Sequence, residues 1–243
     1  MKLLTFSGRN AKEILRDPLN LFFGLGFPIV VLLLLTTIQA NIPVSMFEIA
    51  HLAPGITVFG LSFMTLFSAT LIAKDRGSAL LQRLYTAPLS PRDFILGYML
   101  PILPICLAQA LVCYGVAVVL GLQITVNILW SVLSILPIAL FYVSLGLFCG
   151  SIFTDKQVGG ICGALLTNLS AWVSGIWFDI ALLGGAFQRF AYALPFVHAV
   201  EMEQAILSGN YAGVIPHIYW VMGYGLMTLL AAVLAFLGQM KRQ

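Results

Sequence analysis

Charged side chains are scarce in this sequence. Only 9% of the 243 residues are Asp, Glu, Lys or Arg, whereas 60% are apolar and the mean hydropathy is +1.01. A soluble domain carries about 25% charged residues, so this chain lacks the side chains that a water-exposed surface needs. The same composition excludes a disordered chain. It indicates an integral membrane protein.

Ionisable residues are also missing from the long apolar stretches. A helix needs roughly 20 residues to cross the hydrocarbon core, and this length recurs six times. A proton-coupled carrier or a membrane enzyme usually places an ionisable group in such a span, so their absence argues against both classes. We predict an all-α protein with six transmembrane helices, the third one kinked at Pro101 and Pro104. The predicted spans, none of which contains Asp, Glu, Lys, Arg or His, are Leu19–Ile38, Leu52–Ala73, Phe94–Leu122, Ile128–Phe153, Val158–Phe178 and Ile218–Gly238.

The basic residues are distributed unevenly between the two sides of this arrangement. Of the twelve Lys and Arg residues, only Arg189 falls on one side, and the rest fall on the side that holds both termini and residues 74–93. By the positive-inside rule, both termini are cytoplasmic and the 39–51, 123–127 and 179–217 segments lie outside. A cleaved signal peptide is the alternative interpretation of the first span, but its apolar run exceeds the usual 7–15 residues.

Motifs for catalysis, nucleotide binding and metal binding are absent as well. No Gly-x-x-x-x-Gly-Lys-Ser/Thr loop is present, so the chain cannot hold ATP phosphates in the usual way, and energy must come from another subunit. We expect no catalytic residue and no cofactor in this chain. The histidines are scattered over the outer side and suit interfacial or capping roles, and the cysteines suit the core, so we predict no metal site. These residues are His51, His198, His217, Cys106, Cys113, Cys149 and Cys162.

Two cytoplasmic segments have amphipathic patterns. Residues 2–16 place Leu3, Leu4, Ala11, Ile14 and Leu15 on one arc and the basic residues on the opposite arc, which predicts an interfacial helix within residues 1–17. Residues 74–93 predict a short helix that ends before Pro88. Its apolar stripe either rests on the membrane or fits a groove in a cytoplasmic partner, and we favour the partner. The candidate coupling residues are Arg76, Gly77, Leu80, Leu84 and Pro88.

The outer segment at residues 179–217 predicts a re-entrant hairpin of two short helices. They cover about 187–194 and 196–208 and are separated by Pro195. Glu201 and Glu203 are interpreted as an outward-facing lip rather than a ligand site.

The fifth span carries a stripe of small or polar residues. Such a stripe lets another helix approach closely, either within the chain or across a dimer, and it could also face a translocation route. For Asn168 we expect a hydrogen bond to another helix, with a substrate contact as the alternative. The stripe consists of Gly160, Ala164, Thr167, Asn168, Ala171 and Ser174.

Three stretches in order resemble the membrane subunit of a type-2 ATP-binding-cassette exporter, over essentially the whole chain. The first is Arg9–Leu35, which contains Lys12–Pro18 and then Phe27-Pro28. The second is the charged loop with Gly77, Leu84 and Pro88-Leu89-Ser90 before Gly97. The third, most specific stretch is Ser174-Gly175 followed by Phe187–Phe196 and Ala199-Val200-Glu201. The chain departs from the family pattern at Gln204, where a basic residue is common, and at Tyr98, where a lysine is common.

This resemblance implies one permease domain over residues 1–243 in the plasma membrane of a bacterium or archaeon. It further implies two permease copies, most simply a homodimer, and two cytoplasmic ATPase subunits that bind ATP and Mg²⁺. Because the spans offer only apolar, aromatic and neutral polar groups, we expect an exported cargo that is amphiphilic, such as a drug, an antibiotic or a lipid-like compound. A membrane assembly or immunity factor that transports nothing, and a secondary carrier, are the alternatives.

Overall fold

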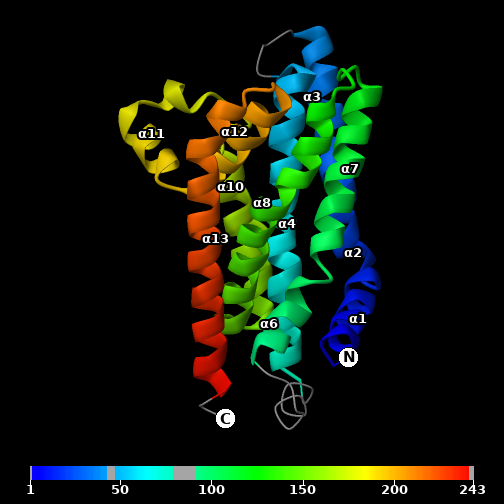
Figure 1. Ribbon diagram of the computed structural model, residues 1–243, viewed down its shortest axis with the longest axis vertical. Helices are drawn as coiled ribbons and strands as arrows, with labels where there is room; N and C mark the ends of the chain where they lie inside the picture. The colour runs from blue at the N-terminus through cyan, green and yellow to red at the C-terminus, as the bar shows by residue number, and fades with distance from the viewer. Residues whose placement is uncertain (1, 43–46, 79–90, 241–243) are drawn as a thin grey trace.

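Helices account for almost the whole chain in the computed structural model, which describes residues 2–42, 47–78 and 91–240. Within these residues, 87% are helical and none forms a β-strand. The long helices run roughly parallel in one bundle, and both ends of the chain lie at the same end of it (Figure 1). The predicted all-α class is confirmed.

Among the described residues, five helical stretches are long and apolar enough to cross a membrane, and each overlaps a predicted span. They cover Pro18–Asn41, Ile49–Arg76, Asp93–Val119, Val126–Ile152 and Tyr211–Gly238. The first consists of α2 (Pro18–Leu21), the π-helical segment η1 (Phe22–Gly26) and α3 (Phe27–Asn41). The second, fourth and last belong to α4 (Ile49–Arg76), α8 (Val126–Ile152) and α13 (Tyr211–Met240).

The third stretch is interrupted where the two prolines predicted a kink. Helix α6 (Pro91–Met99) is followed by a turn at residues 100–102 and then by α7 (Leu103–Val119). Pro101 cannot donate a backbone hydrogen bond, and Pro104 falls in the first turn of α7, where no donor is needed.

The predicted fifth span is shorter than expected. It consists of α9 (Asp155–Val158), the π-helical segment η3 (Gly159–Leu166) and α10 (Thr167–Val173). It ends before Gly175, which adopts a left-handed conformation with φ of +78°. Because the first helical turn is polar, the apolar part covers only residues 158–173, fewer than the roughly 20 residues of a typical span.

Helix α4 lies at the centre of the bundle and packs closely against α8. Gly150 of α8 makes this approach possible, since a Cβ atom there would lie 2.5 Å from the carbonyl oxygen of Ala69. One turn earlier, Gly146 meets Ser68 and the backbone of Thr65 in the same way. The Thr65 hydroxyl donates to the carbonyl of Tyr142 at 2.9 Å. The two helices are therefore joined by small residues and by a hydrogen bond between them.

The outer segment lies at the end of the bundle opposite the termini (Figure 1). It contains η4 (Ile180–Leu183), α11 (Gly185–Tyr192) and α12 (Pro195–Leu207). The two predicted short helices are present, and the break that was predicted at Pro195 lies at residues 193–194, so that Pro195 is the first residue of α12. Helix α12 ends before Gly209, whose φ of +77° suits glycine.

Candidate functional site

The amphipathic N-terminal segment forms α1 (Lys2–Leu15), as predicted, and α1 packs against the bundle. Phe6, Asn10 and Ile14 recur every four residues and are buried, so they form the face that meets the protein. Leu4 and Leu15 are exposed and are free to enter a membrane surface.

Helix α1 is joined to α4 and α6 by polar contacts. Arg9 donates to both carboxylate oxygens of Asp75 in α4, at 2.7 Å and 2.9 Å, and Tyr98 of α6 donates to the same carboxylate at 2.9 Å. Asn10 donates to the carbonyl of Gly97 at 3.0 Å. Asp75 is only 2% exposed, and its charge is compensated by these donors. Helix α1 therefore holds both elements that flank residues 79–90.

The predicted coupling residues divide into two groups. Leu80, Leu84 and Pro88 lie outside the described residues. Arg76 donates to the carbonyls of Gly150 at 2.7 Å and Phe153 at 3.2 Å, so it fastens the end of α4 to the end of α8. A basic side chain at the last carbonyls of a helix also interacts favourably with the helix dipole. Gly77 is exposed at the end of α4.

An apolar cavity of about 600 Å³ lies between η1 and α3, the central helix α4, and the segment η3–α10. Aromatic rings dominate its lining, and Thr167 and Asn168 supply the polar groups. This volume is in the range of small-molecule sites. The lining residues are Phe23, Phe27, Val31, Phe59, Phe63, Gly163, Thr167, Asn168, Ala171, Trp172, Trp177 and Phe178.

Both π-helical segments of the described structure border this cavity, since Phe23 belongs to η1 and Gly163 to η3. A π turn closes one residue later than an α turn, leaves a local irregularity in the helix, and is frequent at functional sites. The coincidence of the two segments at one cavity marks the cavity as a candidate site.

The residues of the predicted small-residue stripe do not share one face: some line the cavity or are buried, and others lie on the protein surface. Thr167 and Ala171 face the apolar cavity and Ser174 is buried, whereas Gly160 and Ala164 are exposed. The side-chain amide of Asn168 donates to the carbonyl of Ala164 at 2.8 Å, one turn back on its own helix, and Asn168 also lines the apolar cavity. A hydrogen bond from Asn168 to a helix of a second copy stays a prediction.

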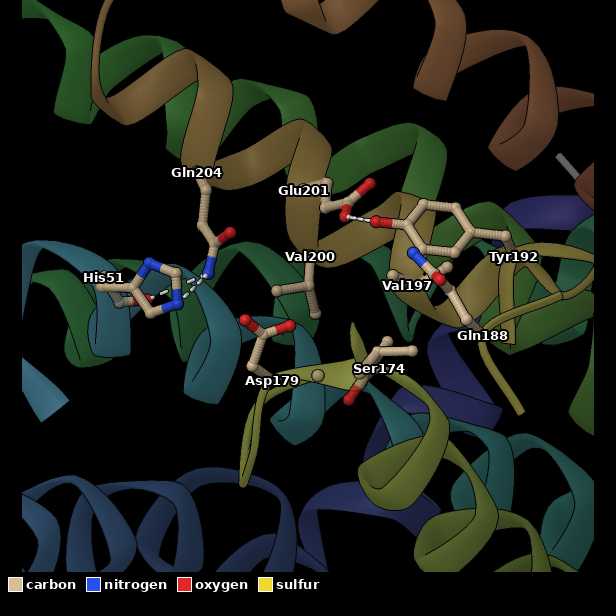
Figure 2. A pocket seen from close by; sticks show the side chains of 11 residues that line it. His51, Ser174, Asp179, Gln188, Tyr192, Val197, Val200, Glu201 and Gln204 are labelled. Atoms are coloured by element: carbon tan, nitrogen blue, oxygen red, sulfur yellow. Dashed lines mark hydrogen bonds between the residues drawn. The ribbon is translucent and has the colours of Figure 1, made fainter. Parts of the chain in front are cut away.

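A second cavity, of about 370 Å³, lies at the end of the bundle opposite the termini and is lined by several polar side chains (Figure 2). Glu201 accepts a hydrogen bond from the Tyr192 hydroxyl on one side of it. On another side, the Gln204 amide donates to the carbonyl of His51 at 3.3 Å, so the residue that departs from the family pattern ties α12 to α4. The cavity is lined by His51, Ser174, Gly175, Asp179, Ile180, Gln188, Tyr192, Val197, Val200, Glu201 and Gln204.

Glu203 does not belong to an outward-facing lip, as the sequence suggested, because its side chain is fully buried. The Tyr114 hydroxyl donates to it at 3.0 Å, and the Ser134 hydroxyl lies 2.6 Å from its other oxygen. Burial raises the pKa of Glu203 to about 8, although these two hydrogen bonds oppose the shift. Ser134 also donates to the carbonyl of Ser131 at 2.8 Å, so its single hydrogen cannot serve both acceptors.

The histidines are less scattered than the sequence indicated. The Nδ1 atoms of His198 in α12 and His217 in α13 lie 2.9 Å apart, and Glu201 lies beside them. Sequence reasoning overlooked the one available signal, the i, i+3 spacing of His198 and Glu201, which puts both on one face of a helix. Pro195, predicted to break the hairpin, opens α12 and thereby orients this face.

The family model described as ABC-2 type transporter matches residues 1–208 of the chain. The match ends just after α12, so it covers every described element except α13. No curated protein sequence matches the chain.

Proposed function

The chain belongs to the ABC-2 type transporter family, and from this we propose that it exports an amphiphilic compound when a separate ATPase subunit drives it. The family establishes a multi-pass permease subunit of an ABC transporter, which implies an ABC ATPase as its partner. ATP and Mg²⁺ would bind to that partner, and this chain would take no part in hydrolysis.

The proposal includes six crossings with both termini in the cytoplasm of a bacterial or archaeal cell. Five stretches have the length of a span, and both termini lie at one end of the bundle (Figure 1). An odd number of crossings cannot return the chain to its starting side, so the segment 155–173 is the best candidate for the sixth. Residues 180–207 would then form a hairpin that dips into the outer leaflet, where protein shelters its backbone.

The aromatic cavity of about 600 Å³ is the observation that carries the cargo assignment. Its rings suit an apolar body, and the hydroxyl of Thr167 and the amide of Asn168 suit a polar end. The described lining offers no charged group, which favours a neutral amphiphile such as a hydrophobic drug or antibiotic over a metabolite with several charges.

Force would reach this cavity through α1. The contacts of Arg9 and Asn10 hold α4 and α6, which flank the segment that contains Leu80 and Leu84. A push by the ATPase on that segment would therefore move α1, α4 and α6 together, and α4 forms one wall of the cavity.

A second copy of the chain would complete the route. Gly160 and Ala164 are exposed beside the cavity, and a Cβ atom added at Gly160 would meet nothing within 4 Å. Small residues allow a helix of a second copy to approach closely at this place, in agreement with a homodimer.

Transport in sealed vesicles tests the proposal. The permease, reconstituted with its ATPase, should move a fluorescent amphiphile only in the presence of ATP. Trp172→Ala, which opens the lining of the cavity, should slow this transport about tenfold or more. Trp130→Ala is the matched control, because Trp130 is similarly exposed (51% against 59% for Trp172) but does not line the cavity.

Three results would contradict this assignment. Equal effects of the two tryptophan changes would remove the cavity from the route. Tight ATPase binding without transport would indicate an assembly factor, and transport that follows an ion gradient without an ATPase would indicate a secondary carrier.

A further inference from the structure

The outer ends of α12 and α13 bring together three side chains that could ligate one metal ion. These are His198 and Glu201 from α12 and His217 from α13, and their ligand atoms all lie within 4.8 Å of one another. The Nδ1 atoms of the two histidines are 2.9 Å apart, and His217 Nδ1 lies 3.5 Å from a carboxylate oxygen of Glu201. We infer that these three residues form a binding site for a divalent transition metal ion, with Zn²⁺ as the best fit.

The spacing of the ligand atoms agrees with this inference. Two nitrogens at 2.0–2.1 Å from a tetrahedral Zn²⁺ lie about 3.3 Å apart, so the histidine pair needs to open by only a few tenths of an ångström. The 3.5 Å separation of His217 from Glu201 already matches such an arrangement.

Each ligand from α12 is oriented by a second contact, as metal ligands usually are. The Nε2 atom of His198 lies 3.0 Å from the carbonyl of Tyr192, so it carries the proton and leaves Nδ1 with a free lone pair. The hydroxyl of Tyr192 donates to the other carboxylate oxygen of Glu201. Tyr192 therefore positions two of the three ligands.

The surroundings of His198 also fix the orientation of its ring. The indole of Trp220 stacks on it with ring centroids 4.8 Å apart and an interplanar angle of 15°. A ligand whose ring is held in place loses little conformational freedom when a metal ion binds.

The site also has an open side. Glu201 and Tyr192 line the outer polar cavity of about 370 Å³ (Figure 2), which gives an ion a route of access and leaves room for a water molecule in the fourth position. Two imidazoles and one carboxylate suit Zn²⁺, Cu²⁺ or Ni²⁺, whereas Ca²⁺ and Mg²⁺ prefer oxygen ligands only.

A bound ion would join the outer hairpin to the last long helix. His217 lies in α13, beyond the residues that the family model matches. The site is independent of the proposed export function, because neither the aromatic cavity nor the contacts of α1 contribute to it.

Calorimetric titration of the purified full chain with Zn²⁺ tests this inference. The protein is purified without a polyhistidine tag, treated with a chelator and kept in detergent micelles, with neither ATPase nor cargo present. We expect one Zn²⁺ per chain. Loss of a residue that only orients a metal ligand typically weakens metal binding 10- to 100-fold. His217→Ala removes a ligand itself, so it should weaken Zn²⁺ binding by at least this factor. Glu201→Gln should also weaken it, whereas His51→Ala, a histidine of the same outer end, should bind as the unaltered chain does.

Fluorescence supplies a second readout that does not depend on a destabilising variant. Bound Cu²⁺ should quench Trp220, which touches a ligand, and Trp220→Phe should lose that quenching while Zn²⁺ still binds. The inference is overturned if the unaltered chain binds no Zn²⁺, if His217→Ala binds it equally well, or if His51→Ala loses it. None of these results bears on transport, so the proposed function is tested separately.

Discussion

Arg9 of α1 and Asp75 of α4, which are 66 residues apart in the chain, form a two-pronged ion pair with distances of 2.7 Å and 2.9 Å. The guanidinium is partly exposed, whereas the carboxylate is buried. The pair holds the N-terminal helix against the end of the central helix that lies near both termini, so a helix that could merely rest on the membrane surface is instead part of the bundle.

Removing this pair should loosen the N-terminal helix. Arg9→Ala leaves the carboxylate of Asp75 buried with Tyr98 as its one remaining donor among the described residues, and we expect a loss of roughly 2 kcal/mol in the free energy of unfolding. Tyr98→Phe removes one neutral donor and should cost less, about 1 kcal/mol. Thermal unfolding in detergent measures both. Lys12→Ala, at an exposed position of the same helix, is the control, and an equal loss in that variant would contradict the interpretation.

A methyl group at Gly97 should displace the N-terminal helix by a different route. A Cβ atom there would overlap the ring of Phe6, so Gly97→Ala should cost about 1–3 kcal/mol of stability. The cost should nearly vanish in a chain that already carries Phe6→Ala, because the overlapping ring is then absent. Additive losses in the double variant would show that Gly97 matters for some reason other than the approach of α1.

The buried carboxyl of Glu203 should make stability depend on pH. Its pKa in the folded chain is about 8, above the ordinary value of 4.5, so between these values the folded chain holds a proton that the unfolded chain has released. Stability should therefore fall as the pH rises from 4.5 to 8 and then level off. Melting temperatures recorded from pH 5 to 9 measure this fall. Glu203→Gln, which keeps both neighbouring hydroxyls paired, should remove it, and an unchanged slope in that variant would disprove the assignment.

Gly150 should be far more sensitive to substitution by alanine than Gly160. Gly150→Ala forces a Cβ atom against the backbone of Ala69, which cannot move aside without separating α4 from α8, so we expect little folded protein in a detergent extract. Gly160→Ala places a Cβ atom where no described residue lies within 4 Å, so this variant should fold normally. Gel filtration of both variants provides the comparison. If Gly150→Ala yields normal amounts of folded protein, the close approach of these helices is not required.

Composition and helical periodicity were sufficient to predict most of the fold. Apolar length located five of the spans, Pro101 and Pro104 located the interruption of the third, and Pro195 located the break between the outer helices. These features depend only on short stretches of sequence. An apolar run must be long enough to cross the bilayer, and proline lacks the N–H group that a helix interior needs, so both can be read from the residues alone.

The sequence could not reveal features that depend on long-range contacts or on an irregular helix. The stripe from Gly160 to Ser174 was laid out with α-helical spacing, but the π turn in η3 shifts its register, so Gly160 faces outward while Thr167 faces the cavity. Glu203 was predicted to be exposed because its partners, Tyr114 and Ser134, are 89 and 69 residues away. The close contact of His198 with His217 likewise depends on how two helices dock.

The central position of α4 has a consequence for how the protein is made. Among the five stretches, α4 is the least apolar and the most completely surrounded by protein. Its main neighbour, α8, ends only at Ile152, so during synthesis α4 exists for some time without the carbonyl that Thr65 later reaches. Residues up to 152 must be synthesised before the whole of α8 can pack against α4. A nascent chain that stops earlier should therefore be recognised and degraded by cellular quality control.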